Sequence, residues 1–307
     1  MWRGPDSSPA CGVPSWVGLS RTGVGDLQAV SLKAYAKINL ALDVLRRRED
    51  GYHEIRSVVQ TISLADDLRL ILKDSPEIQL VCTGDVPRDE RNLAYRAARL
   101  LQEETQIPKG VRIELEKTIP VGAGLGGGSA DAAAVVKGLN DLWELGLSER
   151  EMLRICARLG SDVPFCLLGG TALMQGRGEV VEPLPRLGEL WLVLVRPRVQ
   201  VSTAQVYRAW SQFPPGQPMV DRMLEAIRLR TPMAIAQSLG NMLEPVASCL
   251  FPEVAQVKWF LGNHTLGAVM SGSGPTVFGI VESEEEARDL EERIKSHPWD
   301  VFVVRTV

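Results

Sequence analysis

The sequence predicts an α+β protein of two parts that divide near residue 185. Strand-like alternation and helix-like spacing of apolar residues are mixed along the whole chain, as expected for a protein with both kinds of element. The 307 residues are 45% hydrophobic and 23% charged, a composition typical of soluble globular proteins and a length that suits two domains. Because Pro183-Leu184-Pro185 interrupts the apolar pattern, we expect one domain over 31–185 and a second over 186–307.

The first thirty residues differ from the rest of the chain. They are rich in Gly, Ser and Pro and show no lasting apolar period. They also lack the 7–15-residue apolar core that a signal peptide requires. We therefore expect residues 1–30 to form a disordered N-terminal extension.

The first half of the chain begins with strands. Apolar residues from Ala34 to Leu42 alternate with Lys37, Asn39 and Asp43, the period of two that is typical of a half-buried strand. A turn is predicted at 49–51. A helix is predicted over 92–104, because Leu93, Ala97, Leu100 and Leu101 share helical spacing and Asn92 can cap its start. Further strands are predicted at 55–64, 68–72, 78–82 and 111–115.

More helices are predicted after residue 128. Helices are predicted at 129–145, 151–159, 204–212, 218–230, 241–261 and 284–296. Strands are predicted at 191–195, on both sides of the glycine turn at 271–274, and at 301–304. We find no internal repeat, so the pattern does not indicate a solenoid or an array.

Charge, length of apolar runs and cysteine spacing exclude several function classes. The formal net charge is −4 and the compact basic run Arg46–Arg48 is followed at once by Glu49-Asp50, so no nucleic-acid partner is expected. The run Leu190–Val195 is far shorter than the roughly 20 residues that cross a bilayer, so no membrane partner is expected. The five cysteines and three histidines show no zinc spacing, which favours reduced thiols in a cytoplasmic protein.

A glycine-rich segment is the strongest functional signal. Five glycines lie within seven residues, so the backbone can approach a ligand closely and turn its N–H groups toward it. Small residues then begin a helix whose positive N-terminus faces this loop, an arrangement that binds phosphate. The segment runs Pro120, Val121, Gly122, Ala123, Gly124, Leu125, Gly126, Gly127, Gly128, Ser129, Ala130.

Three other interpretations of this loop are weaker. A Walker loop requires a lysine before Ser129, and none is present. A dinucleotide fingerprint matches formally as Gly122-x-Gly124-x-x-Gly127, but the preceding strand alternates with charged residues, whereas a strand of that fold is apolar on both faces. A flexible loop without a ligand would order many glycines at an entropic cost. Phosphate binding is favoured.

Three polar residues are candidates for catalysis. Lys37 and Asn39 share one face of their strand because side chains alternate, although a solvated strand face is an equally simple interpretation of the pattern. Asp162 lies in a short polar turn, Gly160-Ser-Asp162-Val-Pro164, before apolar sequence. It could instead be an ordinary turn or cap aspartate.

Two further turns could contact a ligand. Ser271-Gly-Ser-Gly-Pro275 connects two predicted strands and could bring backbone to a nucleotide, or could be only a tight connection. Tyr52-His53 follows the Gly51 turn and could bind a flat base. Packing of one aromatic ring against the fold is the alternative.

Together these segments resemble the GHMP kinases. The three motifs of that family are present in order, as Ala34-Tyr-Ala-Lys-Ile-Asn-Leu40, the loop 120–130, and Met270-Ser-Gly-Ser-Gly-Pro-Thr-Val-Phe278. The resemblance covers residues 31–307. It implies a two-domain α+β fold, with a left-handed βαβ unit in the N-terminal domain, a ferredoxin-like C-terminal domain and the active site between them.

The segments around Asp50-Gly-Tyr52-His53-Glu and Gly170-Thr-Ala-Leu resemble one branch of that family. Its members phosphorylate the 2-hydroxyl of a cytidine diphosphate-linked methylerythritol in the non-mevalonate isoprenoid route. The resemblance implies that Asp162 is the base and that Lys37 keeps Asp162 ionised and stabilises the transferring phosphoryl group. It further implies that the loop 120–130 holds the phosphates of ATP, with Ser129 near Mg²⁺ and Lys117 near the nucleotide.

The same resemblance implies a cytosine site. Tyr52 and Tyr207 would stack on the base, His53 would hydrogen-bond its edge, and Asn39 would lie near the substrate. A homoserine or mevalonate type of kinase would not need this site, and a nucleotide-binding module without catalysis would not need both Lys37 and Asp162. The alternative interpretation as a hydride-transfer enzyme depends only on the formal glycine pattern. We expect a cytoplasmic kinase that is a monomer or a weak homodimer.

Overall fold

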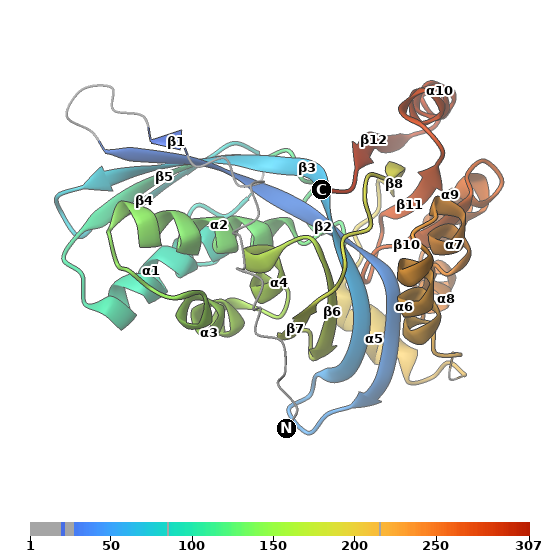
Figure 1. The fold of residues 1–307 in the computed structure, drawn as a ribbon, viewed down its shortest axis with the longest axis horizontal. Coiled ribbons are helices and arrows are strands. Elements are labelled where there is room, and N and C mark those ends of the chain that lie inside the picture. The colour runs from blue at the N-terminus through green and yellow to red at the C-terminus, as the bar shows by residue number, and fades with distance from the viewer. Residues whose placement is uncertain (1–19, 22–27, 85, 215) are drawn as a thin grey trace, which may run out of the picture.

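The computed structural model describes residues 20–21, 28–84, 86–214 and 216–307 (Figure 1). Most of the predicted extension lies outside these residues. Within them, Ser20–Arg21 forms the short strand β1, and β2 begins at Ala29 rather than at 31. The earlier start has a simple cause, because Ala29 and Val30 are buried in the hydrophobic core.

A long antiparallel hairpin of β2 (Ala29–Arg47) and β3 (His53–Lys73) organises the first sheet. The strand order is β1-β2-β3-β5-β4, with β6 on β3, β7 on β6, and β9 parallel to β2. The predicted strands 55–64 and 68–72 are one continuous strand, since the alternation of burial continues between them. The remaining strands of this sheet are β4 (Ile78–Cys82), β5 (Gly110–Glu116), β6 (Thr171–Gly176), β7 (Val180–Pro183) and β9 (Gly240–Asn241).

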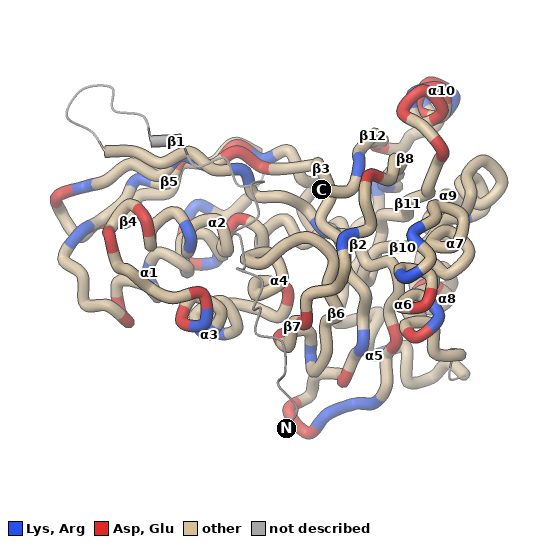
Figure 2. The backbone as a smooth tube through the Cα atoms, in the orientation of Figure 1, with Lys and Arg blue, Asp and Glu red and all other residues tan. Residues whose placement is uncertain are grey.

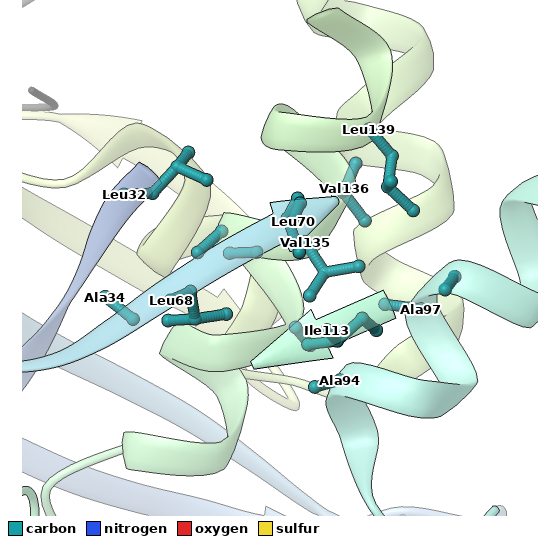
Figure 3. Close-up of a cluster of buried hydrophobic side chains, with 14 of the residues drawn as sticks. Leu32, Ala34, Leu68, Leu70, Ala94, Ala97, Ile113, Val135, Val136 and Leu139 are labelled. Carbon is teal, nitrogen blue, oxygen red and sulfur yellow. The ribbon is translucent and has the colours of Figure 1, made fainter. Parts of the chain in front are cut away.

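Strands β4 and β5 are parallel and are joined through helix α1 (Leu93–Thr105). The side chain of Asn92 caps this helix by accepting the N–H of Ala94, as predicted. The βαβ unit is therefore present, while the left-handedness of its crossover stays a prediction. Figure 3 shows how Leu70 and Ile113 of the strands pack against Ala97 of α1 and Val135 of the next helix, α2 (Gly127–Leu142), to form the core here.

Three helices continue the N-terminal half, namely α2 (Gly127–Leu142), α3 (Glu149–Leu159) and α4 (Val163–Leu168). Helix α3 begins at a capping box in which Ser148 and Glu151 exchange hydrogen bonds. Helix α2 begins two residues before the predicted start, because Gly126 adopts the left-handed conformation that the turn into the helix requires.

The second sheet has four antiparallel strands in the order β10-β11-β8-β12. Helical segments lie between β8 and β10, and α10 lies between β11 and β12. This order and these connections define a ferredoxin-like sheet and confirm that expectation. Its strands are β8 (Trp191–Pro197), β10 (Gly267–Met270), β11 (Val277–Val281) and β12 (Trp299–Arg305).

The predicted helix 241–261 is interrupted. Residues Gly240–Asn241 form β9, and Pro252 starts a new helix after Phe251, whose backbone is not helical. Helices of this half are α5 (Thr203–Trp210), α6 (Val220–Leu229), α7 (Pro232–Gln237), α8 (Glu244–Leu250), α9 (Pro252–Gly262) and α10 (Glu284–Ile294).

One hydrophobic cluster contains residues of both sheets. Ile38 and Ile62 of the first sheet share it with Leu192, Leu194 and Phe278 of the second. The C-terminal residues also pair with β3 through an isolated bridge between Ile62 and Thr306. The division near residue 185 stays a prediction, and the two sheets share this core.

Charges of both signs are spread over both sheets and their helices, and a basic run at the β2–β3 turn is followed by acidic residues (Figure 2). No helix in the described ranges is long and apolar enough to cross a membrane. The cysteines that the structure describes, Cys82, Cys156, Cys166 and Cys249, are unpaired.

Candidate active site

A cleft of about 830 Å³ lies where β2, β3, the loop before α2, the start of α4 and helix α5 meet. It brings together residues that are far apart in the sequence. Nine of the predicted site residues line it, namely Lys37, Asn39, Tyr52, His53, Gly124, Gly126, Ser129, Asp162 and Tyr207.

Lys37 and Asn39 lie on the cleft face of β2. Between and around them Ala36, Ile38 and Leu40 are fully buried on the opposite face, as alternation requires. Lys37 Nζ donates a hydrogen bond of 2.7 Å to Asn39 Oδ1 and lies 3.4 Å from Asp162 Oδ2. The ammonium group is therefore held at the cleft wall beside a carboxylate.

Irregular pairing in β2 directs these two residues. The register with β3 shifts between Tyr35 and Lys37 and again between Asn39 and Ala41. The freed N–H of Lys37 bonds to Leu125 O at 2.9 Å, and that of Asn39 bonds to Ser271 Oγ at 3.3 Å. Such bulges commonly redirect side chains next to active sites, and here they join β2 to both glycine turns.

Asp162 occupies the residue before α4, where an aspartate would normally cap the helix. Its side chain makes no cap hydrogen bond to the described helix and is 34% exposed. Its carboxylate instead faces Lys37 across 3.4 Å. The interpretation as an ordinary cap aspartate is therefore wrong, and the carboxylate is available to a ligand in the cleft.

The glycine-rich loop presents backbone to the cleft. Gly122, Gly124 and Gly126 have φ of 65°, 76° and 70°, which residues with a Cβ rarely adopt. The side chains of Ala123 and Leu125 are buried, so these residues offer only their backbone to a ligand.

Not every residue of the predicted loop lines the cleft. Gly124, Gly126 and Ser129 do so. The side chain of Ala130 is buried in the core, whereas Val121 is exposed.

The two glycine turns are in contact. Ser271 Oγ donates to Gly124 O at 2.9 Å, and a Cβ on Gly124 would lie only 2.3 Å from Ser271 O. Asn241 Nδ2 donates to Met270 O and Gly272 O, both at 2.8 Å. The turn at 271–274 is thus a support for the first loop, more than a simple connection between strands.

Lys117 does not line the cleft within the described chain. Its ammonium group contacts Asp66 and Asp131 beneath the first turn of α2. The resemblance to the GHMP kinases implies that Lys117 lies near the nucleotide, whereas in the structure Asp66 and Asp131 hold its ammonium group.

Aromatic residues gather at the other end of the cleft. The rings of His53 and Tyr207 lie 5.1 Å apart, and Trp210 meets His53 edge-on at 5.7 Å. Burial, followed by the charge of Arg47, lowers the pKa of His53, so its ring is neutral at physiological pH. Tyr52 is 53% exposed, with the guanidinium of Arg177 5.1 Å from its ring centre.

Sequence reasoning missed three residues around this cleft. Arg177 lies between two glycines with positive φ, Gly176 and Gly178, and this Gly-Arg-Gly turn was the signal that could have revealed it. Ser57 accepts a hydrogen bond from Asn39 Nδ2 at 2.8 Å. Trp210 and Ser57 carry no such local signal, because only the fold brings them to the site.

The described residues include no group of three or more His, Cys, Asp or Glu side chains placed to hold a metal ion. A Mg²⁺ bound with a nucleotide takes most of its ligands from phosphate oxygens and water. One hydroxyl and one carboxylate on the cleft wall, those of Ser129 and Asp162, fit that mode of binding.

Comparison with known proteins agrees with this geometry. The model of the GHMP kinases N terminal domain matches residues 92–170, and that of the GHMP kinases C terminal domain matches residues 223–298. A crystal structure of 4-(cytidine 5'-diphospho)-2C-methyl-D-erythritol kinase superposes with a TM-score of 0.76 at 38% identity, covering 90% of this chain and 98% of that one. A homoserine kinase from Cytophaga hutchinsonii has a TM-score of 0.71 at 22% identity, over 94% and 100% of the two chains, which shows the fold alone.

The chain belongs to the GHMP kinases. Two curated relatives make the branch clear. The 4-diphosphocytidyl-2-C-methyl-D-erythritol kinase of Exiguobacterium sibiricum is 47% identical over 90% of this chain and 97% of its own length. That of Geobacillus thermodenitrificans is 48% identical over 90% and 96%. Within the GHMP kinases, the family is therefore that of the 4-diphosphocytidyl-2-C-methyl-D-erythritol kinases.

Proposed function

We propose that the chain transfers the γ-phosphoryl group of ATP to the 2-hydroxyl of 4-diphosphocytidyl-2-C-methyl-D-erythritol, a step of the non-mevalonate isoprenoid route. The observation that carries the proposal is the shared cleft. It holds the Lys37–Asp162 pair, the glycine-rich loop and the aromatic cluster together. A homoserine or mevalonate type of kinase would have no use for the aromatic end.

Asp162 acts as the base that accepts the proton of the acceptor hydroxyl. Its side chain reaches the cleft and is not occupied in capping α4. Phosphoryl transfer needs mainly alignment and neutralisation of charge, so a carboxylate that receives the proton late in the reaction is sufficient. Lys37 neutralises charge on the transferring group, and Asn39 holds Lys37 in place through its 2.7 Å hydrogen bond.

The loop 120–130 holds the phosphates of ATP through its N–H groups and the N-terminus of α2. Mg²⁺, when bound, would supply further neutralisation of the phosphate charge, and the hydroxyl of Ser129 would be one of the groups that hold it. At the opposite end, Tyr52 and Tyr207 stack on cytosine while neutral His53 hydrogen-bonds the edge of the base. The unpaired cysteines of the described chain support action in a reducing compartment, the cytoplasm.

A coupled ADP-release assay with MgATP tests the proposal. The acceptors are 4-diphosphocytidyl-2-C-methyl-D-erythritol, homoserine and mevalonate, each supplied separately. We expect turnover with the cytidyl acceptor alone. Turnover with another acceptor would contradict the cytosine site and retain the phosphate loop, whereas no turnover with all three would favour a nucleotide-binding module without catalysis.

A further inference from the structure

Three charged side chains are buried together beneath the glycine-rich loop. Lys117 Nζ lies 2.8 Å from Asp131 Oδ2 and 2.5 Å from Asp66 Oδ2. The side chains of Lys117, Asp131 and Asp66 are 8%, 4% and 0% exposed. Two carboxylates and one ammonium group are therefore shielded from water, and we call these residues the buried triad.

The triad holds both ends of the loop. Asp66 Oδ1 accepts the backbone N–H groups of Thr118 and Ile119 at 2.6 and 2.8 Å, and these residues directly precede Pro120. Asp131 belongs to the first turns of α2, at the other end of the loop. Because Lys117 contacts both aspartates, strand β3 fixes where the loop begins and where it ends.

Stability alone is a weak explanation for this arrangement. Removing charges from water is costly, and a buried ion pair often contributes no more than apolar side chains of the same volume. Asp131 Oδ1 is buried and has no hydrogen-bond partner in the described part of the chain, which adds to the cost. The free-energy cost of burying these charges next to the phosphate loop indicates that the buried triad has a role in shaping that loop.

We propose that Asp66 and Asp131, acting through Lys117, are positioning residues that hold the phosphate loop in its ATP-binding shape before the nucleotide arrives. The inference rests on the proposed function, because it takes the loop as the ATP site. No residue of the triad lines the cleft in which we propose that the acceptor binds. Loss of the triad should therefore affect ATP and leave the acceptor nearly unaffected, which a general loss of stability would not do.

Two variants test the proposal. In Asp66→Asn the amide keeps one acceptor for the loop but loses the ion pair with Lys117. We expect the KM for ATP to rise at least about tenfold, the scale of one hydrogen bond to a charged group, while the KM for the acceptor stays within about twofold. Asp300→Asn is the matched control, because it removes the 3.0 Å ion pair with Arg196 in the second sheet and should leave both KM values unchanged.

Asp131→Asn tests the other end of the loop. The variant keeps the shape of the side chain and removes its 2.8 Å ion pair with Lys117. We expect the KM for ATP to rise at least about tenfold here too, while the KM for the acceptor stays within about twofold.

The outcomes distinguish failure of the positioning role from failure of the proposed function. Folded variants with the wild-type KM for ATP would overturn the positioning role, while the kinase activity would stand. If Asp66→Asn does not fold, the KM of Asp131→Asn for ATP decides alone, and a wild-type value rejects the inference. Absence of turnover in the wild type would instead contradict the proposed function.

Discussion

At the residue scale, the position of Asp162 has the clearest consequence. The carboxylate of an aspartate directly before a helix usually accepts hydrogen bonds from the free N–H groups of the first turn. Here the carboxylate faces Lys37 instead, and α4 begins with Val163 and Pro164, the latter having no N–H to be capped. The sequence Asp-Val-Pro thus leaves this side chain free for chemistry.

Replacing Asp162 by Asn should abolish most turnover. The amide has almost the same shape but cannot accept the hydroxyl proton, so kcat should fall by at least about 100-fold, the usual contribution of a general base. ATP affinity measured by calorimetry should stay within about threefold. Asp289→Asn, which changes an exposed carboxylate on α10, should have no effect, and full activity of Asp162→Asn would refute the assignment of the base.

Removing the ring of Tyr52 should weaken binding of the acceptor. Stacking of a base on an aromatic side chain contributes about 1–3 kcal/mol, so Tyr52→Ala should raise the KM for the acceptor about tenfold, with little change in kcat or in the KM for ATP. Tyr52→Phe keeps the ring and is the control. Since the side chain is 53% exposed, the fold should tolerate both changes, and an unchanged KM in the alanine variant would remove Tyr52 from the base site.

At the element scale, the contact between the two glycine turns determines which glycines are essential. Gly124→Ala would add a Cβ 2.3 Å from Ser271 O at a φ of 76°. We expect the loops to separate and kcat/KM for ATP to fall by at least about tenfold, as small displacements near a reacting group commonly cause.

Gly146→Ala is the matched control for that substitution. Gly146 also has a positive φ, 66°, but a Cβ there would meet no atom within 4 Å. It should cost stability through backbone strain, about 1–2 kcal/mol, without reducing activity. Equal losses of activity in both variants would show that backbone strain, and not the contact between the turns, is responsible.

Local patterns predicted many elements, and they failed where distant contacts decide. The alternation in β2, the Asn92 cap of α1 and the acidic start of α10 can all be read from neighbouring residues. The continuity of the strand from 55–64 into 68–72 could not be predicted from neighbouring residues. Asp66 is a polar residue in the middle of that strand, and it is buried through contacts with Lys117 and the residues after it. The short elements α4, β6, β7 and α7 were also missed, since four to six residues are too few for a periodic pattern to stand out from the surrounding sequence.

The residues of the candidate site also fall into two groups, those that local motifs indicate and those that only distant contacts place. Lys37, Asn39, Asp162 and the glycine-rich loop stand in recognisable motifs, and the structure places Lys37, Asn39 and Asp162 in one cleft with the loop. The supporting residues Ser57, Asp66 and Trp210 have no motif, because each acts through a partner that is distant in the sequence. Sequence therefore indicates the groups that meet the ligand better than those that hold them.

At the scale of the whole molecule, the shared core makes the two sheets a single cooperative unit. Ile62 is fully buried in the cluster that contains residues of β8 and β11, and it pairs with Thr306. Ile62→Ala should lower the free energy of unfolding by about 2–5 kcal/mol. Calorimetry should still show one transition, at a lower temperature, and two separate transitions would contradict a common core.

The β2–β3 hairpin has a final consequence for the choice of hydroxyl. Asn39 pairs with Val59, and His53 lies six residues before Val59 on the same strand, a span of about 20 Å at the rise of an extended chain. The proposed base site and the proposed reaction site therefore belong to one covalent ribbon, which would set the length of substrate that the cleft accepts. A cytidyl acceptor shortened by one phosphate would reach either end but not both together, so it would compete for the cleft and be phosphorylated slowly.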